Sequence, residues 1–189
     1  GIAMAHNGNV TNFAQLRASL YEDHHRLLET SNDLELILYT LASELEQKDL
    51  GNLSVEDIFD CVRGTQEKVE GAYATISIIA SKGMLAFRDS YGIRPLVLGR
   101  KFTRKGMEYA FASESSCLDY LGFEKIKDML PGEAIFIDND GQVHSSIQRQ
   151  EGCAFCVFEY IYFAREDSVI HDRLVAGERV RMGKSLARK

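Results

Sequence analysis

Two polar groups near the start of the sequence are of types that could act on an amide. Asn7-Gly8 joins an amide side chain to a peptide N–H that no Cβ covers, and such a pair can form an oxyanion hole for acyl transfer. Asp33 can receive the α-ammonium group of a free amino acid through a charge-assisted contact. These three residues are therefore the candidate site residues.

Both groups also have a purely structural interpretation. Asn-Gly is the strongest hairpin-turn dipeptide, because both residues tolerate a positive φ. Asp33 follows Ser31 and Asn32 at the start of a predicted helix, where the positive end of the helix dipole favours a carboxylate that has no other role. The residue types alone leave both interpretations open.

The cysteines give little support to metal or redox chemistry. Cys153 and Cys156 form a C-x-x-C motif, but a second pair is missing and no histidine stands at zinc-finger spacing. Small buried apolar side chains are the favoured interpretation. With Cys61 and Cys117 they lack the spacing of a small secreted disulfide scaffold, so we expect four reduced thiols.

Composition is that of an ordinary globular protein, with 45% hydrophobic and 26% charged residues in a chain of 189. The formal net charge of −6 argues against a broad nucleic-acid surface. No apolar run approaches the roughly 20 residues of a membrane-spanning helix. We expect a cytoplasmic protein without nucleic-acid or membrane partners. Residues 1–5 have the pattern of a buried strand that needs neighbours, so we also expect that an upstream piece is missing.

The positions of apolar residues predict helices first and strands later. A strand over residues 1–5 should end in a turn at 6–9, and Thr11 or Asn12 should begin a helix. A second helix follows Asn32, with Glu35 three residues later as in a capping box, and a third carries Val55, Ile58, Phe59 and Val62.

Strand patterns occupy most of the middle of the chain. They cover residues 71–80, 84–88, 96–99 and 108–112, a short helix covers 115–121, and 133–137 with 142–147 should form a hairpin. The fold class is therefore α+β. The composition changes near Gly152 to an aromatic-rich and then a charged stretch. We therefore predict one domain over residues 1–151 and the start of another over 152–189.

Several segments, read in order, resemble the glutaminase domain of class II glutamine amidotransferases. The final stretch, 158–168 (FEYIYFAREDS), is similar to the segment that joins this domain to a phosphoribosyltransferase domain in the amidophosphoribosyltransferase branch of the family. The other matching segments are 5–12 (AHNGNVTN), 31–35 (SNDLE), 71–74 (GAYA), 86–96 (AFRDSYGIRPL), 112–114 (ASE) and 131–134 (PGEA).

The resemblance implies an N-terminal-nucleophile hydrolase fold, a four-layer αββα sandwich that is incomplete here. In that family the thiol of the mature N-terminal cysteine attacks the glutamine side-chain amide, and its own α-amine serves as base. The match assigns Asn7 and Gly8 to the oxyanion hole and Asp33 to the glutamine α-amino group. The catalytic cysteine is absent from this chain, so the chain alone is expected to be inactive.

The family also implies substrates, cofactors and assembly. Ammonia from glutamine would pass to phosphoribosyl pyrophosphate and give 5-phosphoribosylamine, the first committed step of purine synthesis. Mg²⁺ would bind in the transferase domain outside this chain, and the intact protein would be a homo-oligomer. Cys156 matches an iron–sulfur ligand of one branch of the family, but the other ligands would lie beyond Lys189, and we expect no cluster.

Two other functions remain open at this point. A glutaminase-like domain without a nucleophile could act as a binding or regulatory module. A related amidotransferase could deliver ammonia to a sugar phosphate instead. The residues preceding Gly1 would distinguish the first alternative, and the chain past Lys189 would distinguish the second.

Overall fold

The computed structural model describes residues 1–188, which form two compact units. The first unit contains residues 1–94 and 130–154, and the second contains the remaining described residues. The predicted division after residue 151 concerns the domains of a longer protein and stays a prediction. Both units combine helices with antiparallel sheets, so the α+β class is confirmed.

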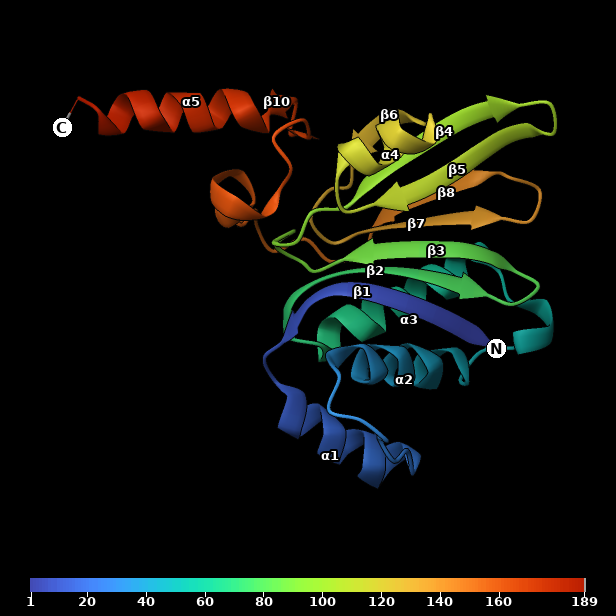
Figure 1. Cartoon of the computed structure of the whole chain (residues 1–189). Coiled ribbons are helices and arrows are strands. Elements are labelled where there is room, and N and C mark those ends of the chain that lie inside the picture. Colours follow the sequence, from blue (N-terminus) through green and yellow to red (C-terminus); the bar gives the residue numbers. More distant parts are fainter. Residues whose placement is uncertain (189) are drawn as a thin grey trace. The chain divides into compact units, whose positions relative to one another are not determined.

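The first unit is built on a five-stranded antiparallel sheet in the order β1-β2-β3-β7-β8. Its apolar core lies between the sheet and the helices α2 and α3, which run beneath β1 to β3 (Figure 1). Its strands are β1 (Ile2–Val10), β2 (Gly71–Ile79), β3 (Gly83–Arg88), β7 (Glu133–Asp138) and β8 (Val143–Ile147). Its helices are α1 (Phe13–His24), α2 (Asp33–Leu45), the short 3₁₀ helix η1 (Leu50–Asn52) and α3 (Val55–Lys68).

The second unit has a three-stranded antiparallel sheet in the order β5-β4-β6. Its sheet strands are β4 (Val97–Thr103), β5 (Gly106–Ala112) and β6 (Glu124–Asp128), with α4 (Ser115–Leu121) between β5 and β6. The remaining elements are the π-helix η2 (Glu159–Phe163), the two-residue strands β9 (Val169–Ile170) and β10 (Arg173–Leu174), and α5 (Val175–Leu186).

The helix and hairpin predictions are confirmed with small shifts at their ends. Asn12 is the N-cap of α1, and the turn at 139–141 joins β7 to β8. The capping box expected at α2 does not form. Asn32 does accept the Leu34 N–H at 2.9 Å, but the Glu35 carboxylate accepts the N–H groups of Glu29 and Thr30 instead. Glu35 therefore stabilises the loop before α2 and does not cap the helix.

A capping box is present at the start of α3, where it was not expected. The Ser54 hydroxyl accepts the Asp57 N–H at 3.1 Å, and the Asp57 carboxylate accepts the Ser54 N–H at 3.1 Å. Two N–H groups of the first helical turn are thereby satisfied, and α3 carries Ile58 and Val62 into the core.

Replacing Ser54 by alanine is expected to lower the free energy of unfolding by about 1 kcal/mol, because one of these N–H groups loses its acceptor. Denaturant unfolding measures the change. Ser31→Ala is the matched control, since Ser31 is exposed and stands outside the α2 cap. Equal midpoints for both variants would show that the box contributes nothing.

Candidate functional site

The predicted turn at residues 6–9 is wrong, because β1 continues through these residues to Val10. Asn7 lies opposite Ala74 of β2, and Gly8 lies opposite Tyr73. The glycine has a φ of +152°, and a Cβ on it would stand 1.9 Å from the Ala72 carbonyl oxygen. The missing side chain therefore allows close pairing with β2, and here tertiary pairing overrides the local turn preference of Asn-Gly.

The hydrogen bonds at the two ends of β1 show which of its backbone groups do not bond to β2. Ala80 N–H donates to Gly1 O, and Thr11 N–H donates to Glu70 O. In an antiparallel pair the bonded direction alternates, so odd-numbered residues of β1 face β2 and even-numbered residues face the other way. β1 is an edge strand of the described sheet, so the Gly8 N–H points toward an open edge.

Asp33 occupies the same edge. It is the first residue of α2, and its Oδ2 accepts the N–H of Val10 at 2.9 Å. Because a strand rises about 3.4 Å per residue, the Val10 and Gly8 N–H groups lie roughly 7 Å apart along the edge. The structure therefore brings Asp33 close to Gly8, although the two residues are 25 positions apart in the sequence.

Side-chain alternation places Asn7 on the sheet face opposite the helices. Its even-numbered neighbours Ile2, Met4 and Val10 pack in the core beside α2, so the odd-numbered Asn7 projects from the other face. Asn7 is half-buried. An amide side chain and a peptide N–H from consecutive residues thus lie beside one edge, with a carboxylate further along it. This arrangement can hold a carbonyl oxygen and an ammonium group of the same small molecule.

His6 belongs to this region, although the sequence analysis did not single it out. As an even-numbered residue its side chain projects on the helix side, and Asp33 is its principal charged neighbour. Burial lowers the pKa of His6, and the Asp33 carboxylate opposes this shift. A neutral imidazole supplies no positive charge to Asp33. His6, Gly8 and Val10 are alternate residues of one strand, and this spacing could have identified His6. The turn expected at residues 6–9 hid the relation.

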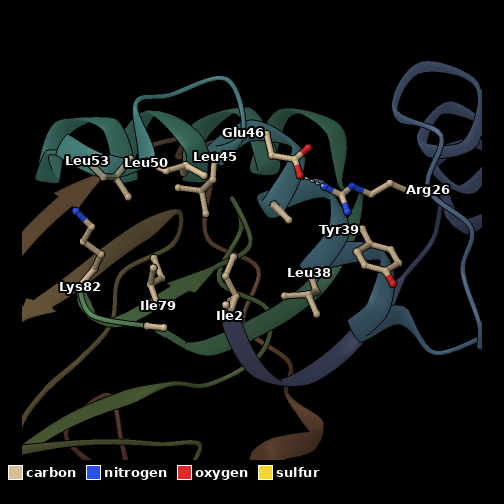
Figure 2. A pocket seen from close by; sticks show the side chains of 13 residues that line it. Ile2, Arg26, Leu38, Tyr39, Leu45, Glu46, Leu50, Leu53, Ile79 and Lys82 are labelled. Carbon is tan, nitrogen blue, oxygen red and sulfur yellow. Dashed lines mark hydrogen bonds and ion pairs between the residues drawn. The ribbon is translucent and has the colours of Figure 1, made fainter.

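An apolar cavity in the first unit lies at the other end of β1. Figure 2 shows Ile2, Leu38, Leu45 and Ile79 around this space of about 470 Å³. The Arg26–Glu46 ion pair lies on its rim. Gly8 is six residues along the strand from Ile2, which corresponds to about 20 Å. The cavity lacks the convergent polar groups of a reactive site and is not part of the candidate site.

The described residues hold no group of three or more His, Cys, Asp or Glu side chains that could bind a metal ion. The four cysteines are free. Cys156 therefore has no assembled set of iron–sulfur ligands in the part of the chain described here. Cys153 is exposed and Cys156 is half-buried, so the expectation that these two are buried apolar side chains is wrong. Burial raises the pKa of the Cys61 thiol to about 11, so this thiol is protonated and a weak nucleophile at neutral pH. None of the described helices is long and apolar enough to cross a membrane.

The chain is similar to known proteins over most or all of its length. A family model described as the glutamine amidotransferase domain matches residues 1–120. The amidophosphoribosyltransferase of Haemophilus influenzae is 42% identical over 191 residues, which cover 100% of this chain and 38% of the relative. The enzyme of the same name from Escherichia coli is 44% identical over 196 residues, with the same coverage.

A solved structure is also similar over the whole chain. The glutamine phosphoribosylpyrophosphate amidotransferase of B. subtilis, complexed with ADP and GMP, aligns with a TM-score of 0.81 and 29% identity. The alignment covers 100% of this chain and 38% of that structure. The chain thus spans about 38% of the length of the relatives it matches.

Proposed function

The chain belongs to the glutamine amidotransferase domain family, and from this premise we propose that it is part of the glutaminase domain of an amidophosphoribosyltransferase. The proposed activity of the whole protein is hydrolysis of glutamine to ammonia and transfer of that ammonia to phosphoribosyl pyrophosphate. The relatives of that name match this chain from end to end, which supports the choice of this branch.

The single observation that carries the proposal is the common edge shared by Gly8 and Asp33. The Asp33 carboxylate bonds Val10 N–H, and the Gly8 N–H lies two residues away on the same side of β1. The Val10 and Gly8 N–H groups lie roughly 7 Å apart along this edge, a distance that the extended side chain of glutamine can bridge. Glutamine would place its α-ammonium against Asp33 and its side-chain carbonyl oxygen against the Asn7 and Gly8 donors.

In the proposed reaction a thiol from another part of the longer protein attacks the side-chain carbon of bound glutamine. A carbon–sulfur bond forms, negative charge develops on the carbonyl oxygen, and the Asn7 amide and Gly8 N–H stabilise it. The carbon–nitrogen bond then breaks, and a proton transferred from the thiol completes the leaving ammonia. Water hydrolyses the resulting thioester to glutamate. The role of this chain is to position the substrate and stabilise its oxyanion.

The rest of the proposal concerns the longer protein. Ammonia would displace pyrophosphate from phosphoribosyl pyrophosphate in a transferase domain that uses Mg²⁺. The segment from residue 152 onward would lead into that domain, and the intact protein would form a homo-oligomer. The similarity to a phosphoribosylpyrophosphate amidotransferase over the whole chain supports the proposed phosphoribosyl acceptor.

Replacing Asp33 by asparagine in the full-length protein tests the substrate assignment. We expect the KM for glutamine to rise about 10-fold or more, because the α-ammonium loses a charge-assisted contact, while kcat changes much less. Asparagine keeps an oxygen that can accept the Val10 N–H, so the local structure should survive. Steady-state kinetics with glutamine and with free ammonia make the measurement.

Asp23→Asn, on the exposed side of α1, is the control for removal of one nearby negative charge. An unchanged KM in Asp33→Asn would remove Asp33 from the glutamine site. Absence of any glutamine-dependent activity in the unaltered full-length protein would instead favour the binding or regulatory module.

A further inference from the structure

The outer side of β8 forms an open edge of the five-stranded sheet. Among the described strands, β8 pairs with β7 alone. The Gln148 N–H and the Gln142 carbonyl oxygen both bond backbone groups on the β7 side, at 2.9 and 3.1 Å. Because the bonded direction alternates along an antiparallel strand, the even-numbered residues of β8 face β7. The outward N–H and C=O groups are those of Val143, Ser145 and Ile147.

The described part of the chain does not protect this edge. None of the outward backbone groups bonds another described residue. The strand reads Val-His-Ser-Ser-Ile, without lysine or proline, and its register with β7 is continuous without a bulge. The Val143 and Ile147 side chains are 39% and 46% exposed. These are the features of an edge to which another strand can add.

The strand is complementary to a second copy of itself. It has a branched apolar residue at each end and no acidic residue, lysine or arginine, so two copies do not repel each other. A twofold axis through Ser145 sets Val143 opposite Ile147 of the second copy and Ser145 opposite its own counterpart. These are hydrogen-bonded pairs, in which both residues exchange N–H···O bonds. Every outward backbone group of β8 then has a partner, and the apolar ends meet each other.

The same axis brings together two polar side chains that complement each other. His144 Nε2 bonds Asp138 Oδ2 at 2.9 Å, and a carboxylate only accepts, so Nδ1 of the neutral ring is left as an acceptor. The His144 side chain is 30% exposed. Ser146 is half-buried, and its hydroxyl has no partner among the described residues. With the axis at Ser145, the Ser146 hydroxyl of the second copy lies opposite His144 and can donate to Nδ1.

We propose that β8 is an interface with a second copy of this chain, in which two sheets join edge to edge about a twofold axis at Ser145. The backbone groups, the apolar ends and the His144–Ser146 pair all match about this one axis, which favours a second copy over a strand of another protein. A twofold contact closes on itself and forms no open fibre. Two five-residue strands bury less than the roughly 1,000 Å² of a stable interface, so this contact alone is weak.

Disulfide trapping in the full-length protein tests the axis. In Ser145→Cys the two new thiols belong to a hydrogen-bonded pair with Cα atoms about 5.5 Å apart, which a disulfide can span. Gln142→Cys is the matched control. Gln142 is exposed on the same hairpin, but its two copies would lie six residues apart along the strands, or about 20 Å. With oxidised glutathione as the oxidant, we expect about 10-fold more covalent dimer in Ser145→Cys than in Gln142→Cys.

A mixture of two further variants tests the register. Val143→Cys should form a disulfide with Ile147→Cys, because these residues oppose each other across the axis. Two copies of Val143→Cys should not, because their thiols lie four residues apart, or about 14 Å. A size tag on one variant identifies the mixed dimer on a non-reducing gel. The unaltered protein gives the background from its four free cysteines.

Ser145→Pro tests the interface without a cross-link. The ring removes the outward N–H and occupies the edge, whereas the bonds of β8 to β7 come from its even-numbered residues and remain. Ser145→Ala is the control, since both variants lose the hydroxyl that donates to Glu133 Oε1 at 2.5 Å. By sedimentation equilibrium, self-association should weaken about 10-fold in Ser145→Pro relative to Ser145→Ala.

Two results would overturn the proposal. One is a covalent dimer of Ser145→Cys no more abundant than that of Gln142→Cys, and the other is equal self-association of the proline and alanine variants. The trapping experiment decides the question if Ser145→Pro does not fold. These measurements require no glutamine, so they are independent of the proposed glutaminase activity.

Discussion

Replacing Asn7 by alanine in the full-length protein is expected to lower glutamine-dependent turnover by about 10²-fold or more. The side-chain amide would no longer donate to the oxyanion that forms when the glutamine carbonyl is attacked, and one such donor contributes roughly 3 kcal/mol to transition-state stabilisation. Activity with free ammonia should survive, because that reaction needs no oxyanion at β1. Steady-state rates with each nitrogen donor give the comparison.

Asn9→Ala is the matched control. Asn9 lies on the same strand and projects from the same face as Asn7, but it is further along β1 and exposed. Glutamine-dependent turnover in this variant should stay within a few-fold of the unaltered protein. Equal loss of glutamine-dependent and ammonia-dependent activity in Asn7→Ala would show that Asn7 has a structural role.

Replacing Gly8 by alanine is expected to destabilise the fold by about 3 kcal/mol or more and to abolish glutamine-dependent activity. Two physical effects add. An L-residue is strained at a φ of +152°, and the new methyl group would lie 1.9 Å from the Ala72 carbonyl oxygen, so β1 and β2 must separate locally. That movement also displaces the Gly8 N–H. Thermal unfolding and glutamine kinetics measure the two consequences.

Gly141→Ala separates the effect of φ from the effect of the contact. Gly141 has a φ of +77°, and a Cβ placed on it would meet nothing within 4 Å. Its replacement should therefore cost only about 1 kcal/mol, the typical strain of such a backbone conformation. A Gly8→Ala variant as stable as Gly141→Ala would contradict the close approach between β1 and β2.

The sequence predicted the elements whose side chains follow one clear period. Leucines at helical spacing located α2, the β-branched run after Gly71 located β2, and the turn at 139–141 located the β7–β8 hairpin. β6 escaped prediction because its sequence, Glu-Lys-Ile-Lys-Asp, is almost entirely charged. Its strand conformation comes from pairing with β4, a tertiary contact that composition does not report.

The residues of the candidate site stay a prediction, and the local geometry expected for them was wrong. Asn7, Gly8 and Asp33 came from residue chemistry and family resemblance, whereas the turn expected around Gly8 was wrong. Local preference could not reveal that Gly8 is needed for close contact with Ala72 across the sheet. Nor could it show that Asp33 bonds Val10, because this contact joins the start of a helix to the end of a strand.

The bond between Asp33 and Val10 also limits how far another peptide can extend the sheet. An unpaired edge is a template on which further strands can assemble, with the risk of self-association. At Val10 the Asp33 carboxylate already occupies the N–H that an incoming strand would need. A strand that added to β1 as far as Gly8 would consume the donor proposed for catalysis. Resistance to strand addition and availability of the catalytic donor therefore depend on the same condition. The outward N–H groups of Gly8 and Val10 must not pair with the backbone of another strand.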